Sequence, residues 1–228
     1  MYEDFGLQHE YIKIEKDHTT SFGGSQAWFY TKSIQKSGCG RIAGQDLALY
    51  LGCYHPGSQT PAFRKLRFQK GCITWESYER YSRRMRKWFP VIPYLGMPGW
   101  FLPVGLNLYF RKYHVPYRVR WGVLPGNLLQ RIEEMLKADI PVILAVGQNF
   151  PFFWGRRRLT FYQKKNGRYE ESVKVKAHYV TVTHMQGKWL TISSWGKEYY
   201  INWDEYLVYV KKYSSYLFSN ICYVYKRT

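Results

Sequence analysis

The sequence predicts an α+β fold in which helices come first and an antiparallel sheet follows. In the first half, apolar residues recur at helical spacing, whereas the second half has short alternating segments rich in β-branched and aromatic residues. The length of 228 residues and the hydrophobic content of 46% suit one domain with a sizeable core. We therefore expect a single domain over 1–228, helical at about 39–138 and β-rich at about 140–228.

The first long helix is expected from Cys39 to about Leu51. Cys39, Ala43 and Leu47 fall on one face of it, and Gly52 is a suitable stop. Further helices are predicted at 74–89 with Thr74 as N-cap, at 101–113, and at 125–140 with Asn127 as N-cap, and a loop is predicted at 90–100.

The strands are predicted from apolar runs and from alternation. "PVILAVG" at 141–147 predicts a buried strand, and "YIKIEK" at 11–16 a first strand, followed by a loop at 19–33. An antiparallel sheet is expected from "RRLTFYQKK", "SVKVKAHYVTVTHM", "KWLTISSW" and "KEYYIN", with turns at "NGR" and "MQGK". "WDEYLVYVKKY" predicts a short helix, or a helix followed by a strand.

The formal net charge of +18 favours an anionic partner: nucleic acid, a membrane surface or an acidic protein. The basic residues are spread along the chain without a nucleic-acid module, so nucleic acid is the less favoured partner and a solvated basic surface open to an acidic partner is preferred. The apolar runs are too short to span a bilayer, and the first twenty residues lack a signal-peptide core. A cytoplasmic protein without transmembrane segment is expected.

The four cysteines are Cys39, Cys53, Cys72 and Cys222, and no pair forms a CxxC motif. Cys53 and His55 resemble half of a zinc site but lack a second pair of ligands. No metal, cofactor or disulfide is therefore predicted.

Cys39 is the candidate nucleophile, because it lies between Gly38 and Gly40 at the expected start of a helix. The positive end of a helix lowers a thiol pKa, and glycines leave room for a substrate backbone. The Cys39 N–H could also donate to an oxyanion. Cys72 also precedes a helix but lacks a companion motif. The alternative for Cys39 is a small buried hydrophobe.

His178 is the candidate base among six histidines. It begins the strand "HYVTVT", and the hairpin at "MQGK" returns as "WLTISSWG", which would bring Ser193 close enough to orient the imidazole. The alternative for His178 is a structural histidine at a strand start, and the alternative for Ser193 is a polar residue at a strand end.

These motifs together resemble the papain-like cysteine peptidase superfamily. "AHYVTVTHMQGKWLTISSWG" is similar to its histidine hairpin, and "SGCGRIAGQDLALYLG" and "KADIPVILAVG" to the helix and strand of its bacterial double-glycine peptidase-like branch. The resemblance covers roughly Gly23 to Tyr206. It implies a thiol peptidase that forms an acyl-enzyme, with Cys39 as nucleophile, His178 as base and a glutamine that holds the oxyanion.

Two glutamines precede the cysteine, and either could be that glutamine. Gln26 is preferred, because Gly23 and Gly24 free its loop to reach the helix start, whereas Gln35 lies too close to fold back. The alternative for Gln26 is an ordinary turn residue.

The sequence departs from the family at two positions. Ser193 stands where papain-like enzymes have Asn or Asp, so it can accept a hydrogen bond but supplies no charge, and Arg41 replaces a proline in the first helical turn. A cysteine hydrolase acting on peptides or proteins is therefore the first prediction, with acyl transfer at the same site left open. The alternative is a catalytically inactive papain-like module that binds an acidic protein or nucleic acid. A nucleic-acid-binding protein of unrelated fold is a third, weaker reading.

Overall fold

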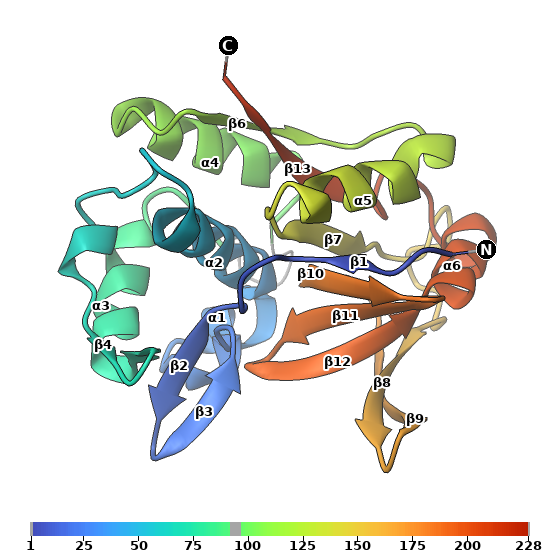
Figure 1. Cartoon of the computed structure of the whole chain (residues 1–228). Helices are drawn as coiled ribbons and strands as arrows, with labels where there is room; N and C mark the ends of the chain where they lie inside the picture. The colour runs from blue at the N-terminus through green and yellow to red at the C-terminus, as the bar shows by residue number, and fades with distance from the viewer. Residues whose placement is uncertain (1, 92–96, 228) are drawn as a thin grey trace.

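The computed structural model describes residues 2–91 and 97–227 and confirms an α+β architecture with the helices first (Figure 1). Of the loop expected at 90–100, residues 92–96 lie outside the described residues. The helices are α1 (Lys32–Ser37), α2 (Cys39–Tyr54), α3 (Trp75–Met85), α4 (Phe101–Lys112), α5 (Leu128–Lys137) and, within the sheet region, α6 (Trp203–Tyr213).

The large sheet forms the second layer, and the strand pairs recorded in it are antiparallel. Its strand order is β6-β13-β7-β10-β11-β12-β8-β9, and β1 pairs with β10 outside this path. The strands are β1 (Phe5–Gly6), β6 (Tyr117–Trp121), β7 (Val142–Val146), β8 (Leu159–Lys165), β9 (Arg168–Val175), β10 (His178–Gln186), β11 (Trp189–Ser194), β12 (Lys197–Asn202) and β13 (Ile221–Lys226).

A smaller sheet lies beside the helices and has the order β3-β2-β5-β4. Its strands are β2 (Lys13–Lys16), β3 (Thr19–Phe22), β4 (Phe68–Gln69) and β5 (Cys72–Thr74), and β2 runs parallel to β5. The segment 19–33, expected as a loop, contains β3, a 3-10 turn at Gln26–Trp28 and the start of α1. Gly23 has a φ of +76°, a backbone conformation that favours glycine.

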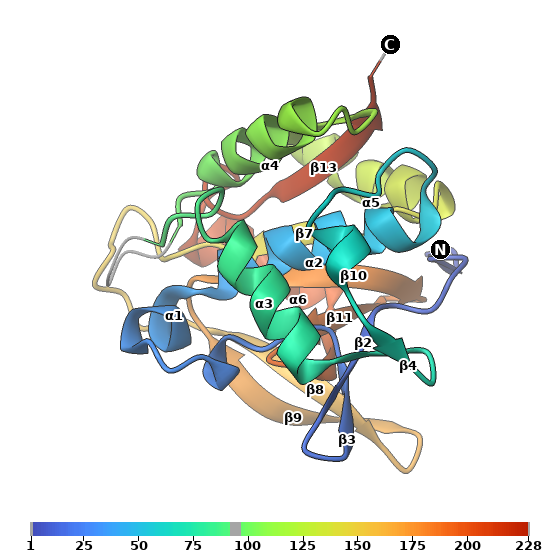
Figure 2. The ribbon, with the colours of Figure 1, turned by 90° about the vertical axis from the view of Figure 1, so that its left-hand side faces the viewer.

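Helix α2 is the central element of the core and packs against β10, β7 and α4 (Figures 1 and 2). Leu47, Leu49 and Tyr50 are fully buried. Gly52 was expected to end the helix, but it lies inside α2. A Cβ at this position would come 2.5 Å from the Phe63 ring. Close packing, not chain reversal, requires this glycine.

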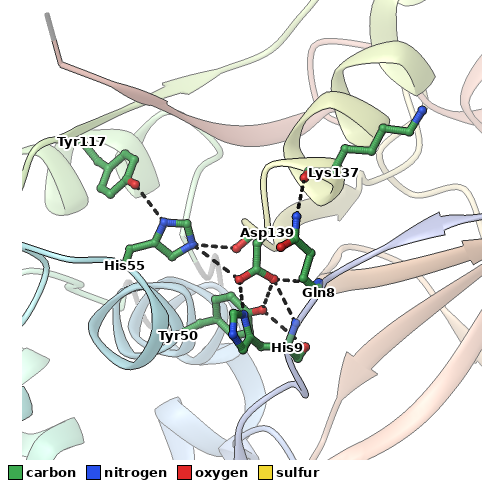
Figure 3. A network of polar contacts seen from close by, with 7 residues as sticks. All are labelled: Gln8, His9, Tyr50, His55, Tyr117, Lys137 and Asp139. Carbon is green, nitrogen blue, oxygen red and sulfur yellow. Dashed lines mark hydrogen bonds and ion pairs between the residues drawn. The ribbon is translucent and has the colours of Figure 1, made fainter.

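The far end of α2 is fixed by a polar cluster around Asp139 (Figure 3). Tyr50 Oη donates to Asp139 Oδ1 at 2.6 Å, and His9 Nδ1 lies 2.6 Å from Oδ2. His55 bridges the Asp139 carbonyl oxygen at 2.7 Å and Tyr117 Oη at 2.8 Å. The cluster ties α2 to the N-terminal segment, to β6 and to the turn after α5.

The ends of the other helices differ in detail from the expectation. Thr74 and Asn127 occupy the N-cap positions of α3 and α5, but neither side chain makes a capping hydrogen bond. Asn202 does cap α6, where it accepts from the N–H groups of Asp204 and Glu205. No helix in 2–91 or 97–227 combines the length and apolar character needed to span a membrane.

Candidate active site

Cys39 is the first residue of α2, and its half-buried side chain lines a cavity of about 20 Å³. Gly38 is required by the packing of the protein itself, and Gly40 is closely packed. A Cβ on Gly38 would come 2.5 Å from the Ile34 carbonyl oxygen, and one on Gly40 would come 3.1 Å from the Tyr179 ring. These contacts give the two glycines a packing role, and the expectation that they leave room for a substrate stays a prediction.

His178 begins β10 and lines the same cavity as Cys39. Its Nε2 lies 2.7 Å from the Ser194 hydroxyl oxygen. The indole of Trp195 stacks on its imidazole with ring centroids 4.2 Å apart and an interplanar angle of 17°. The ring is thus fixed by one hydrogen bond and one stacked face, and Nδ1 is the nitrogen left for chemistry.

Ser193 does not orient His178, so the residue expected in that role is corrected to Ser194. Ser193 Oγ instead donates to the Phe22 carbonyl oxygen at 2.7 Å. Consecutive residues on a strand point in opposite directions, so an error of one position exchanges the two serines. The doublet "SS" was the only sequence signal for Ser194, and it could not decide between them.

The loop that carries Gln26 is bound to the same hairpin. Besides the Ser193 contact, the Gly196 N–H donates to the Gly24 carbonyl oxygen at 3.0 Å. Gln26 is buried, lines the cavity, and donates through Nε2 to the Gln35 carbonyl oxygen at 2.7 Å. A carboxamide nitrogen has a second hydrogen to donate. Gln35 is exposed and supports Gln26 through its backbone, and its side chain does not line the cavity.

The cavity keeps the cysteine and the histidine neutral. Burial raises the pKa of the Cys39 thiol, and this outweighs the N–H groups of Tyr179, Gly40 and Cys39 itself, which lower it. Burial also lowers the pKa of His178 to about 3. The helix start therefore acts on the thiol as expected, but burial is the stronger effect, and the resting pair is thiol and neutral imidazole.

Asp46 is a functional candidate that sequence reasoning missed. It is 2% exposed, lines the cavity, and accepts from the Gly24 N–H at 2.8 Å and from Tyr78 Oη at 2.6 Å. Burial raises its pKa to about 7, against the hydrogen bonds from Tyr78 and Gly24. Its spacing of seven residues from Cys39, two helical turns, was the available signal.

The remaining candidates lie elsewhere. Arg41 does not line this cavity and donates to Ser82 instead, and Cys72 lies in β5 and is likewise not among the lining residues. Within 2–91 and 97–227, no three His, Cys, Asp or Glu side chains are grouped to hold a metal ion.

Comparisons with known proteins leave the family of the chain open. No family model matches the sequence, no curated protein matches it, and no solved structure matches it at a significant level. The function must therefore be argued from the cavity and its residues.

Proposed function

We propose that the protein is a papain-like cysteine hydrolase that cleaves peptide bonds through Cys39 and His178. The observation that carries the proposal is the shared cavity, which is lined both by a cysteine at a helix start and by an imidazole that Ser194 orients. Gln26 supports the proposal, because it lines the same cavity and its carboxamide has a second hydrogen to donate to an oxyanion.

The chemistry follows from the neutral resting pair. With Nε2–H donating to Ser194, Nδ1 of His178 can take the Cys39 proton while the sulfur attacks the carbonyl carbon. The new C–S bond forms, the proton passes to the leaving amine, and the C–N bond breaks. Water then attacks the thioester with His178 as base, which releases the acid and restores the thiol. An amine acceptor in place of water would make the same site a transferase.

The cavity must open before a substrate can bind. A volume of about 20 Å³ holds about one water molecule. Trp195, which stacks on His178, and Gln26 both line this small space.

The test is hydrolysis of a mixed fluorogenic peptide library by the wild type, Cys39→Ser, His178→Ala and, as matched thiol control, Cys72→Ser. We expect turnover in the wild type and in Cys72→Ser and none in the first two variants. A peptide aldehyde should also form a Cys39 adduct that intact-mass spectrometry detects. Turnover that survives in Cys39→Ser would contradict the proposal.

A second function is favoured by the neutral pair and the small volume of the cavity: a catalytically inactive module that binds an acidic protein. The hydroxyl of Ser194 supplies no charge, and the net charge of +18 suits such a partner. In that case the wild type would neither turn over the library nor form the aldehyde adduct, although it would bind an acidic protein in a salt-dependent way.

A further inference from the structure

A second cavity, separate from the one at Cys39, has a volume of about 730 Å³. It is lined by residues of α1, α2, the end of α3 and α4, and by the segment 61–65. The described residues that line it include no Asp or Glu. Its basic lining residues are Arg41, Lys65, Arg83, Arg84, Arg86 and Lys87.

Arg41 is the buried member of this group and is only 3% exposed. Its guanidinium donates to the carbonyl oxygen of Ser82 and, at 3.0 Å, to the Ser82 hydroxyl. Its Nε has no hydrogen-bond partner, and no ion pair to a carboxylate is formed within 2–91 and 97–227. Residues 92–96, "IPYLG", contain no acidic side chain. A buried charge without a counterion is costly, so an external anion would stabilise it.

Aromatic rings form another part of the wall. Trp88 packs edge-on against Tyr109 at 5.7 Å and Tyr113 at 6.4 Å, and Lys87 Nζ lies 5.0 Å from the Trp88 ring centroid. Trp88 and Tyr113 are partly exposed and line the cavity, so a flat ligand ring has surfaces on which to stack.

We propose that this basic pocket binds a nucleotide, with the phosphates on the arginines and the base against the aromatic wall. Guanidinium groups suit phosphate because they bind it with paired hydrogen bonds. The volume lies within the range of about 300–1,000 Å³ for small-molecule sites, whereas an acidic protein would need an open surface. The proposal does not depend on peptidase activity.

The experiment is isothermal titration of the full chain, carrying Cys39→Ser to exclude turnover, with ATP, tripolyphosphate and adenosine. We expect ATP to bind at least tenfold more tightly than either of the others, because it has both chemical parts. The test variant is Arg84→Glu/Arg86→Glu, whose exposed side chains line the pocket. It should weaken ATP binding at least tenfold and abolish the rise in Tm that ATP gives the parent protein.

The matched control is Arg156→Glu/Arg158→Glu, which makes the same charge change at exposed positions outside the pocket. It should alter the ATP affinity by less than about threefold. Arg41→Gln, with its folding checked by circular dichroism, should also weaken ATP binding at least tenfold.

Three results would overturn the proposal. They are no ATP binding at millimolar concentration, equal weakening in the control and test variants, or equal affinity for ATP and tripolyphosphate. Displacement of ATP by a short single-stranded oligonucleotide that binds more than a hundredfold more tightly would assign the pocket to a nucleic-acid surface instead.

Discussion

Two neighbouring serines show how finely the candidate site depends on single positions. Ser194 contacts the imidazole of His178, whereas Ser193 binds the backbone of Phe22 and so holds the loop that carries Gln26. The first contact acts on the base directly, and the second acts on the geometry around it. Removal of each hydroxyl therefore has a different expected effect.

Ser194→Ala should lower kcat/KM for peptide hydrolysis about three- to tenfold, because loss of one neutral hydrogen bond is worth about 1 kcal/mol. Ser194→Asn, which introduces a carboxamide that can also bond to the imidazole, should recover part of the loss. Ser193→Ala is the matched control. It should lower the thermal stability and leave the pH profile of kcat/KM unchanged. Equal pH profiles and equal kcat/KM for the two alanine variants would contradict these roles.

The thiol of Cys39 should be slow to react in the resting protein. Because burial raises its pKa, alkylation by iodoacetamide at pH 7 should be slower than that of a free cysteine and should speed up above pH ~9. Peptide mapping by mass spectrometry assigns each rate to a cysteine. Rapid alkylation of Cys39 at pH 6, lost in His178→Ala, would show an ion pair instead.

At the scale of elements, the Asp139 cluster decides how α2 is held at the end opposite Cys39. Burial alone would raise the pKa of Asp139, but hydrogen bonds from Tyr50, His9 and Gln8 outweigh it, so the pKa lies below the usual value. The ionised carboxylate thus stabilises the fold above the unfolded pKa of about 3.9, and this contribution is lost as the pH falls.

Asp139→Asn should therefore lower the free energy of unfolding at pH 7 by about 1–3 kcal/mol, because the variant loses a charged acceptor. Asp17→Asn is a matched control, since Asp17 also has a positive φ but its side chain is exposed. It should cost less than about 0.5 kcal/mol. Urea unfolding at pH 7 compares them, and equal losses would deny the cluster its role.

The long periodic elements could be predicted from the sequence, and the short ones could not. α2, α3, α4, α5 and β7 lie within a few residues of their expected bounds, because an apolar face and flanking turn residues mark them. β3 and α1 were missed because they are short and lack a clear apolar pattern. β6 and β13 were missed because their pairing depends on distant partners; β13, for example, pairs with both β6 and β7. The end of α2 was predicted at Gly52, because a glycine needed for close packing cannot be told from a helix-ending glycine in the sequence.

The candidate site was predictable in its motifs but not in its electrostatics. Cys39, His178 and Gln26 line one cavity; the glycines at a helix start pointed to the first, the hairpin motif to the second and the glycine-rich loop to the third. Asp46 was missed because a carboxylate on an apolar helix face looks like an ordinary surface residue until Gly24 and Tyr78 are brought to it. The pKa of Cys39 depends on burial, which local sequence does not reveal.

At the scale of the whole molecule, two buried groups in the candidate site act on stability in opposite directions. Asp46 has a pKa raised to about 7, so between pH ~4 and ~7 the folded chain keeps a proton that the unfolded chain has lost, and stability falls as the pH rises. His178 has a pKa lowered to about 3, so between pH ~3 and ~6.5 only the unfolded chain binds its proton, and stability rises with pH. Over their common range the two slopes cancel.

Single substitutions should uncover these opposing slopes. Relative to the wild type, Asp46→Asn should gain stability from pH 4.5 to 6.5 by about 1 kcal/mol per pH unit, and His178→Gln should lose stability at a similar rate. The double variant should run parallel to the wild type, because both slopes are then absent. Urea unfolding at pH 4.5, 5.5 and 6.5 measures all four proteins. If the stability of both single variants changes with pH in parallel with that of the wild type, neither group changes its protonation on folding. The neutral His178 from which the proposed mechanism begins would then lose its support.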